Sequence, residues 1–528
     1  FIYIDKNNKH IFLSLYNLAE TMGIPSYFSH IIKEHRKIIK QISSPKYGNT
    51  DYLFLDSNSI IYDVIRSLDY SKEDQQFEDN AIHEICKHIK YYIKIINPKF
   101  KTLIAFDGVA PVAKLKQQQS RRYKNAYLKT QFPQKEPEWD TSAITPGTDF
   151  MKKLSLGVTD FFSAHKSVIV STSEEFGEGE HKIFEYIRSN HKMLEHKQLI
   201  VYGLDADLIM LTLQHLHYCP KIFLFRETPH FIKSIDKTLN PNELYALDIP
   251  QFSEIIKDDM NTLPQQSAVS DYIFISFMLG NDFIPHMPAL NIRTNGIDRI
   301  FDAYRATISN KTYLTKNGKI NWRAFKRFID YLAKNEHQYI KYEYGLRDKQ
   351  EKRVSKIMTH KSPSEKWDLS PQVDRSVERF INPCLDGWQW RYYKMLTDID
   401  TEHVSKRNIC INYLEALEWT LHYYTIGCKN TKWSYHYMYP PLLEDLSSYI
   451  PTFSSEFIDT NTIPITADTQ LAFVLPESCS YLLTSKMRQK MQAYYKKNAS
   501  FATEGAFCKY FWETHIKISP LSLYELET

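Results

Sequence analysis

The sequence lacks the features that mark secreted, membrane-spanning and disulfide-stabilised proteins. Its seven cysteines are odd in number, widely separated and never spaced as Cys-x-x-Cys, which speaks against a disulfide scaffold or a zinc knuckle and favours a reducing compartment. No apolar run approaches the roughly 18 residues that cross a bilayer, and the short IFLSL segment near the N-terminus has no signal-peptide cleavage pattern. We therefore expect an intracellular protein without a membrane span, cytoplasmic rather than nuclear, and leave a viral setting open.

The chain also lacks a strong net charge, internal repeats and low-complexity segments. A formal charge of +4 with 43% hydrophobic and 24% charged residues is typical of a globular protein. Any affinity for nucleic acid must therefore come from local clusters of positive charge. The 528 residues exceed the size at which one hydrophobic core stops growing, so we expect two packed regions or one large elaborated domain.

Short apolar runs alternate with helix-like patterns between about residues 50 and 300. This alternation predicts an α/β fold with a mainly parallel central sheet flanked by helices. The runs are YLFLD, TLIAFD, SVIVS and LIVYGLD, and each leads into acidic residues. Because the loops after the carboxyl ends of parallel strands gather at one edge of a sheet, these acids are expected to lie together.

The rest of the chain is divided by composition and periodicity. Charge-rich sequence without clear periodicity predicts a linker or insertion, and the apolar spacing beyond it predicts a largely helical second region packed against the first and closing the active site. The default expectation for the C-terminal segment is a helix that packs on the core. The expected segments are an extension of unknown role (1–21), the α/β domain (22–339), the charged linker or insertion (340–378), the helical region (379–485) and the C-terminal segment (486–528).

Seven carboxylates stand at strand ends or in a glycine-rich segment between strands. Two i, i+2 pairs occur in FGEGEHK and GLDADLIML, where alternate residues of an extended segment would share one face and the glycines allow close backbone approach. Another acid follows the apolar DYIFISFMLGN, at the end of an expected buried helix. The seven are Asp56, Asp107, Glu178, Glu180, Asp205, Asp207 and Asp282.

So many carboxylates at short range would raise one another's pKa values unless cations compensate them. All-oxygen ligands favour Mg²⁺ or Mn²⁺ over zinc, and seven acids exceed the needs of one Mg²⁺, so two ions are expected. A pair of ions about 3.5–4 Å apart suits in-line hydrolysis of a phosphodiester. Taken singly, however, each aspartate after a strand could instead be a turn residue or a helix N-cap.

A basic segment follows the second strand-end acid. Six cations and no acid lie between Gly108 and Lys129, namely Lys114, Lys116, Arg121, Arg122, Lys124 and Lys129. A solvated helix face is the usual explanation of such a run. A phosphate pocket is the alternative, because helical spacing gathers four residues on one face and Arg forks suit phosphate oxygens. The four are Lys114, Gln118, Arg121 and Arg122.

These segments together resemble the Xrn family of 5′→3′ exoribonucleases. The resemblance covers most of residues 22–480 and weakens in the second half, where it rests on segments such as LDGWQWRYYKM and WSYHYMYPP. It implies a 5′ nuclease or PIN-like fold and a near-minimal catalytic core. The strongest motifs, in the order of the family, are MGIPSYF, LFLDSNSIIY, AFDGVAPVAKLKQQQSRRY, ITPGTDFM, EFGEGEHKIFEYIR, YGLDADLIMLTL and FMLGNDFIPHMPAL.

The resemblance also implies roles for single residues. The seven acids match the family's metal-binding catalytic residues, and the four residues of the basic face match its 5′-monophosphate pocket. Trp433 matches an aromatic residue that stacks on the 5′ nucleotide. Two positions depart from the family pattern: Tyr62 replaces the usual His opposite that stacking ring, and Ser59 replaces the usual Gly.

Three functions remain open at this stage. The first is a monomeric, processive exonuclease that releases 5′-mononucleotides from single-stranded RNA bearing a 5′ monophosphate. The second is a 5′ nuclease acting on DNA flaps, since that class has a similar acidic cluster, and the 2′-hydroxyl would discriminate the two. The third is an RNA-binding scaffold that kept the fold and lost activity.

Overall fold

The computed structural model describes residues 24, 26–43, 48–71, 74–133, 137–226, 237–240, 243–261, 267–397 and 403–528. The extension predicted over residues 1–21, and Met22 with which the MGIPSYF motif begins, lie outside the described residues.

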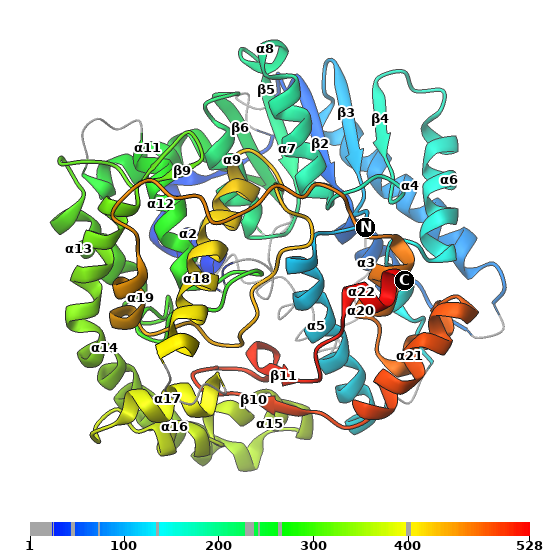
Figure 1. Ribbon diagram of the computed structural model, residues 1–528. Coiled ribbons are helices and arrows are strands. Elements are labelled where there is room, and N and C mark those ends of the chain that lie inside the picture. The colour runs from blue at the N-terminus through cyan, green and yellow to red at the C-terminus, as the bar shows by residue number, and fades with distance from the viewer. Residues whose placement is uncertain are drawn as a thin grey trace.

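A seven-stranded sheet organises the first half of the chain, with the strand order β1-β7-β6-β5-β2-β3-β4 (Figure 1). The strands from β6 to β4 pair in parallel, whereas β7 pairs antiparallel with both β6 and β1. The prediction of an α/β fold with a mainly parallel sheet is confirmed. The strands are β1 (Ile39–Gln41), β2 (Tyr52–Asp56), β3 (Lys101–Ala105), β4 (Val168–Ser171), β5 (Gln198–Tyr202), β6 (Lys221–Arg226) and β7 (Tyr245–Asp248).

Helices cover both faces of this sheet because alternate residues of its strands point to opposite sides. On β2, Tyr52 and Phe54 enter one core, while Leu53 and Leu55 enter another. The first core is closed by α2 (Tyr27–Glu34), α7 (Gly179–Ser189), α9 (Asp207–His215), α11 (Ile249–Met260) and α12 (Ala268–Ser276). The second is closed by α3 (Asn58–Ser67), α4 (Phe77–Ile96) and α6 (Asp149–Phe162).

The first core continues without a break into the predicted helical region. Helix α18 contacts α9, and α14 contacts α13 and α19, so the helical region and the sheet share buried side chains. The helices of this part are α13 (Gly296–Thr307), α14 (Trp322–Ile357), α15 (Pro363–Asp368), α16 (Ser376–Ile381), α17 (Trp388–Leu396), α18 (His403–Thr425) and α19 (Leu443–Tyr449).

The charged segment 340–378 is not a linker, and this sequence prediction was wrong. Helix α14 runs unbroken through its first half, and α15 and α16 occupy much of the remainder. Some of its charged side chains are buried in ion pairs, such as Glu343 with Arg299 at 3.0 Å and Arg347 with Glu378 at 2.5 Å. The segment therefore continues the helical region.

The C-terminal segment packs around the basic helix α5 (Val112–Gln131), as Figure 1 shows. It is only partly helical, because two short strands pair antiparallel within it. Among the described residues, no helix is both long and apolar enough to cross a membrane. The remaining elements are α8 (His191–Leu194), β8 (Thr315–Lys316), β9 (Lys319–Ile320), α20 (Ala467–Val474), α21 (Ser485–Lys497), β10 (Ala502–Glu504), β11 (His515–Lys517) and α22 (Leu523–Glu527).

Candidate functional site

Three neighbouring strands bring carboxylates to one edge of the sheet. Asp56 is the last residue of β2, Asp107 lies two residues beyond β3, and Asp205 follows β5. These strands are adjacent and parallel, in the order β5-β2-β3, so their carboxyl ends lie side by side. The structure gathers these acids where their strand-end positions predict.

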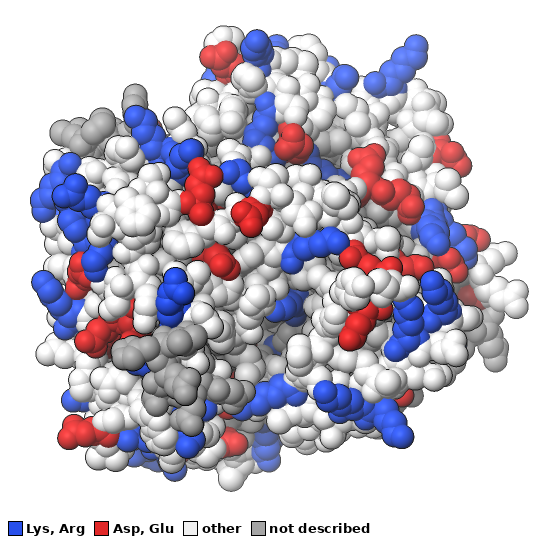
Figure 2. Space-filling view, viewed as in Figure 1, with Lys and Arg blue, Asp and Glu red and all other residues white. Residues whose placement is uncertain are grey.

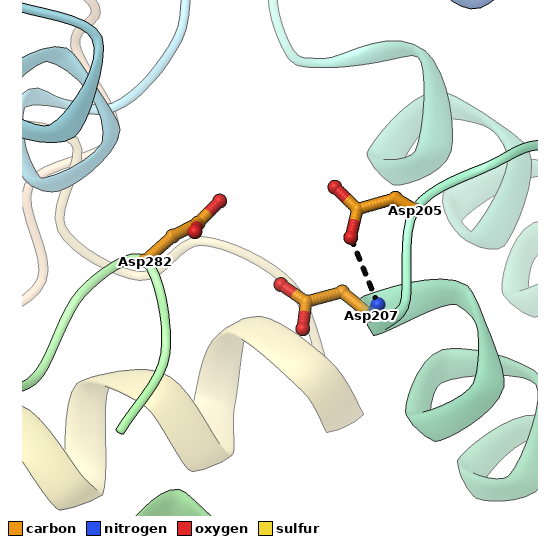
Figure 3. Close-up of side chains that lie close together, drawn as sticks. All are labelled: Asp205, Asp207 and Asp282. Atoms are coloured by element: carbon orange, nitrogen blue, oxygen red, sulfur yellow. Dashed lines mark hydrogen bonds between the residues drawn. The ribbon is translucent and has the colours of Figure 1, made fainter. Parts of the chain in front are cut away.

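The two i, i+2 pairs lie at helix N-termini and not in extended segments, which corrects the sequence prediction. Glu178 is the N-cap residue of α7 and Glu180 lies in its first turn, while Asp207 is the first residue of α9. The N–H of Asp207 donates to Asp205 Oδ1 at 3.0 Å (Figure 3). The first N–H groups of a helix have no partner within it and the helix dipole favours negative charge there, so both acid pairs lie where anions are stabilised.

Gly179 lies where the backbone of α7 approaches two strand ends most closely. Its N–H donates to Asp107 Oδ1 at 2.7 Å. A Cβ at this position would lie 2.6 Å from Asp56 Oδ1 and 3.1 Å from the carbonyl oxygen of Ala105. Any side chain would displace the carboxylates, so the close approach requires glycine here.

Asp282 joins the cluster from a distant part of the chain. It follows α12 and a turn at Gly280, whose φ of +88° favours glycine. One carboxylate oxygen from each of Asp205, Asp207 and Asp282 lies within 4.8 Å of the others, and Figure 3 shows the side chains turned toward a common space. A single cation could contact all three.

Lys114 of α5 lies among these acids. Its ammonium is 2.7 Å from Asp282 Oδ2 and 3.0 Å from Glu178 Oε1, and all three side chains are buried. Burial alone would lower the pKa of Lys114, but Asp282 and Glu178 raise it well above its usual value. Lys114 is therefore a buried cation that compensates part of the carboxylate charge.

Among the described residues, Lys114 is the cation that lowers the pKa values of the neighbouring acids, and it does not offset the whole cluster. Burial, followed by repulsion from neighbouring acids, raises the pKa values of Asp56, Glu180 and Asp207 well above their ordinary range. Asp56 Oδ1, Glu180 Oε2 and Asp207 Oδ1 are buried and accept no hydrogen bond from the described residues. Buried carboxylate oxygens without donors fit a hard divalent cation such as Mg²⁺ or Mn²⁺.

Two tyrosines of α18 complete the surroundings of the carboxylates, and sequence reasoning missed both. Tyr423 donates its hydroxyl to Glu178 Oε2 at 2.6 Å, and Tyr424 forms a side-chain hydrogen bond with Asp207. The only signal in the sequence is the pair of adjacent polar rings at the end of the apolar segment NYLEALEWTLHYY.

A large open cavity of about 2630 Å³ lies beside the cluster and reaches Asp282. Arg121 and Arg122 of α5 line it together with Tyr62, and Lys and Arg side chains are visible in and around a hollow near the centre of the face in Figure 2. Burial lowers the pKa of Arg122, and its Nε is buried without a hydrogen-bond partner. Gln118 is half-buried on the same helix.

Comparison with known proteins identifies the family. A family model described as XRN 5'-3' exonuclease N-terminus matches residues 22–228, and one described as Xrn1 helical domain matches residues 263–379 and 381–503. The chain belongs to the Xrn family. The first match contains the strand-end acids and α5, and the second contains Asp282, Trp433 and the tyrosines of α18.

The relatives carry names that describe one activity. The protein named 5'-3' exoribonuclease 1 of Saccharomyces cerevisiae is 25% identical over 618 residues, with 89% of this chain and 40% of the relative covered. Its namesake in Homo sapiens is 27% identical over 544 residues, with 88% and 31% covered. The 5'-3' exoribonuclease 2 homolog of Drosophila melanogaster is 26% identical over 592 residues, with 87% and 64% covered. This Xrn-family chain thus spans less than two thirds of each of these relatives.

A solved structure described as the catalytic core of Rad2 in complex with DNA substrate is a more distant match. The two sequences are 12% identical, and the match covers 81% of this protein and 93% of the solved chain with a TM-score of 0.34. A likeness at this level supports no conclusion about fold or substrate.

The two aromatic positions singled out from the Xrn resemblance lie in different surroundings. Trp433 is half-buried, its Nε1 donates to Glu415 Oε2 at 3.1 Å, and its ring stacks on Trp419 with centroids 5.3 Å apart. Tyr62 is also half-buried and lies under the guanidinium of Arg66, 5.6 Å from the ring centroid. Both side chains are thus partly exposed, and Tyr62 lines the cavity.

Removal of divalent cations is expected to make the stability of the protein fall as the pH rises. Burial, opposed by Lys114, raises the pKa of Asp205 to about 6, and Asp56 and Asp207 are raised further above the unfolded value of about 4. The folded protein then binds more protons than the unfolded chain, so the free energy of unfolding in EDTA should decrease as the pH rises through these folded pKa values. Thermal melts in EDTA and in Mg²⁺ at about pH 5 and about pH 8 measure this effect.

The comparison between EDTA and Mg²⁺ is needed because other buried acids act in the same direction. Burial raises the pKa of Glu336, which accepts two backbone hydrogen bonds at the start of α19, to about 8. That contribution is expected with and without Mg²⁺. A stabilisation by Mg²⁺ that is no larger at the higher pH would contradict the assignment of the carboxylates.

Proposed function

We propose that this protein is a processive 5′→3′ exoribonuclease that hydrolyses single-stranded RNA and releases 5′-mononucleotides. The observation that carries the proposal is the convergence of seven acids from five separate parts of the chain, at strand ends, helix N-termini and the turn after α12, in a member of the Xrn family. The names of the relatives, which describe 5'-3' exoribonucleases, support the direction and the substrate.

The seven carboxylates are proposed to hold two Mg²⁺ ions, with Mn²⁺ as a substitute. Bound ions would supply an activated water and stabilise the leaving oxygen of an in-line displacement at phosphorus. The cluster offers unpartnered oxygens on Asp56, Glu180 and Asp207 for this purpose. Lys114 would hold its place between Asp282 and Glu178, where it orients both acids and lies close to the cavity wall formed by Asp282.

The 5′ phosphate is proposed to bind at the face of α5 that carries Lys114, Gln118, Arg121 and Arg122. Arg122 supports this best, because its buried Nε lacks an acceptor and its Nη1 makes only a long contact of 3.4 Å with the carbonyl of Ser142. A phosphate oxygen would satisfy the free donor. A pocket of fixed size would also refuse a triphosphate or a cap.

Three matched RNAs with 5′-monophosphate, 5′-hydroxyl and 5′-triphosphate ends test this pocket. The wild type is expected to degrade the monophosphate fastest. Arg122→Ala should lower kcat/KM for that RNA by about 10- to 100-fold, which corresponds to one charged hydrogen bond of about 1.5–3 kcal/mol, and should leave the hydroxyl RNA nearly unaffected.

Lys129→Ala is the matched control, because Lys129 is an exposed cation in the last turn of the same helix and also lines the cavity. It should weaken binding of all three RNAs alike through lost phosphate attraction. Equal decay of the three RNAs by the wild type would reject the pocket. A DNA strand of the same sequence degraded as fast as RNA would instead favour a flap-type DNA nuclease.

We also propose that the protein acts as a monomer inside the cell, in the cytoplasm. The seven cysteines support a reducing compartment, since all are free. Light scattering of the purified chain tests the oligomeric state.

A further inference from the structure

Two adjacent tyrosines at the end of α18 reach from the helical region to carboxylates of the sheet region. Tyr423 contacts Glu178 at 2.6 Å and Tyr424 bonds to Asp207, and both rings are almost fully buried. Neighbouring residues on a helix point about 100° apart, since 3.6 residues make a turn. One helix end can therefore serve two acids that belong to different helices, α7 and α9.

These contacts fix the orientation of both acids. Glu178 receives Lys114 on Oε1 and Tyr423 on Oε2, so its carboxylate is held from two sides. Asp207 receives the hydroxyl of Tyr424 while its Oδ1 accepts no hydrogen bond. In both cases a donor from the helical region holds the carboxylate, and Asp207 Oδ1 remains available as a ligand. Figure 3 shows α18 passing beneath Asp207 and Asp282.

Tyr423 is also part of a continuous stack of rings. It stacks on His181 with centroids 4.5 Å apart and an interplanar angle of 13°, and on Trp419 at 4.9 Å and 15°. Trp419 in turn stacks on Trp433 at 5.3 Å and 25°. Phe283, next to Asp282, packs edge-on against Trp419 and Tyr423 at 4.9 and 5.1 Å. The stack runs from the helix that carries Glu178 to Trp433.

Tyr424 does not belong to this stack. Its ring lies at 59° to that of Tyr423 and packs against Phe277 with centroids 5.2 Å apart. The two tyrosines thus lie at the same helix end, are both buried and each have a carboxylate partner, but only Tyr423 is stacked in line with Trp433.

We propose that Tyr423 and Tyr424 are positioning residues for the metal-binding carboxylates, and that Tyr423 couples the Trp433 ring to Glu178 through the stack. The proposal rests on the proposed function and on Trp433 stacking on the 5′ nucleotide, as the Xrn resemblance implies. Displacement of Trp433 by a base would move Trp419 and Tyr423, and with them the hydroxyl that orients Glu178. Occupancy by a nucleotide and the geometry of the metal site are linked in this way.

The first experiment removes each hydroxyl and keeps each ring. Tyr423→Phe and Tyr424→Phe are expected to weaken Mn²⁺ binding, measured by calorimetry without RNA, by about 10- to 100-fold, because partners that orient metal ligands contribute to affinity on that scale. The rate kcat should fall by a similar factor, with KM for RNA unchanged. Tyr413→Phe is the control, since Tyr413 lies on the same helix, is fully buried, and its hydroxyl has no hydrogen-bond partner within the part of the chain that the structure describes.

The second experiment combines each tyrosine variant with Trp433→Leu. Contacting groups show non-additive effects, whereas independent ones add. In the double variant Tyr423→Phe, Trp433→Leu, the loss of kcat should differ from the product of the two single losses by about threefold or more. In the double variant Tyr424→Phe, Trp433→Leu, the loss of kcat should equal the product of the two single losses.

Unchanged Mn²⁺ affinity in Tyr423→Phe and Tyr424→Phe, or loss of cooperative melting in either, would overturn the positioning role. Equal coupling of both tyrosines to Trp433 would overturn the link through the stack. A wild type that binds Mn²⁺ but degrades no RNA would reject the proposed function, and weaker Mn²⁺ binding by Tyr423→Phe would still support the positioning role.

Discussion

The double variant Asp205→Ala, Asp207→Ala is expected to lose RNA hydrolysis by about a thousandfold or more while it still folds and binds RNA. One carboxylate oxygen of each acid lies within 4.8 Å of one from Asp282, and Asp207 is the first residue of α9. Their removal therefore takes away two of the three carboxylates that could hold a cation there. A bound ion contributes several kcal/mol of transition-state stabilisation, and each 1.36 kcal/mol is about tenfold in rate. Single-turnover decay of a 5′-monophosphate RNA in Mg²⁺ measures the loss.

The same variant should be more stable than the wild type in EDTA. Burial raises the pKa of Asp207 well above its usual value, so at neutral pH the folded state holds an acid that resists ionisation. Removal of that acid relieves the penalty, although the two smaller side chains leave some space. Opposite signs for activity and metal-free stability are the signature of a metal-binding carboxylate.

Asp302→Ala serves as a control, because Asp302 is an exposed acid on α13. It should change neither property. If the double variant degraded RNA at more than about a tenth of the wild-type rate, the two acids would not be part of the catalytic site. If the wild type degraded no RNA and bound RNA as the double variant does, the protein would be an RNA-binding scaffold.

Four strands of the sheet could be predicted from the sequence, including the edge strand β4, whereas the interior strands β6 and β7 and the edge strand β1 could not. The four predicted runs correspond to β2, β3, β4 and β5, where buried strands give continuous apolar segments. Strand β6 has a similar run, KIFLFR, that was missed, and β7 and β1 contribute only four and three residues. Such short strands form because β6 offers β7 a pairing edge and β7 offers one to β1, which is a property of the assembled sheet.

Ion pairs between distant residues explain the wrong prediction over 340–378. Arg375 has a fully buried side chain that contacts Asp348 at 2.5 Å and Glu378 at 2.7 Å, and Glu378 also pairs with Arg347. In the sequence these residues are typical of a solvated linker. A charged side chain can be buried in the core only when a partner of opposite charge is in place, and local composition does not reveal that partner.

The same limit applies to the candidate site. The seven acids and α5 could be found because the acids follow strands or an apolar helix and the basic residues have helical spacing, which are local signals. Tyr423 contacts Glu178 across 245 residues, and the two adjacent tyrosines in the sequence do not reveal which acids they contact. The prediction that Glu178 and Glu180 share an extended segment was wrong because the glycine between them begins a helix.

Lys114→Met is expected to lower the free energy of unfolding of the metal-free protein by about 3–5 kcal/mol, the usual cost of breaking a buried ion pair from one side. Lys114 contacts Glu178 and Asp282, so its loss leaves two buried carboxylates without their cation. Denaturant unfolding in EDTA measures the change. Hydrolysis of 5′-monophosphate RNA should also fall steeply, because Glu178 loses one of the two groups that orient it.

Lys116→Met separates this effect from the loss of any lysine on α5. Lys116 donates only to the carbonyl of Tyr435 at 2.8 Å, and burial lowers its pKa to about 8, so its replacement should cost no more than about 1–3 kcal/mol. Mg²⁺ should reduce the loss in free energy of unfolding caused by Lys114→Met, because added cations compensate the same carboxylates. It should leave the loss caused by Lys116→Met unchanged. Equal deficits of the two variants in EDTA, or an equal response to Mg²⁺, would show that Lys114 does not compensate the carboxylate cluster.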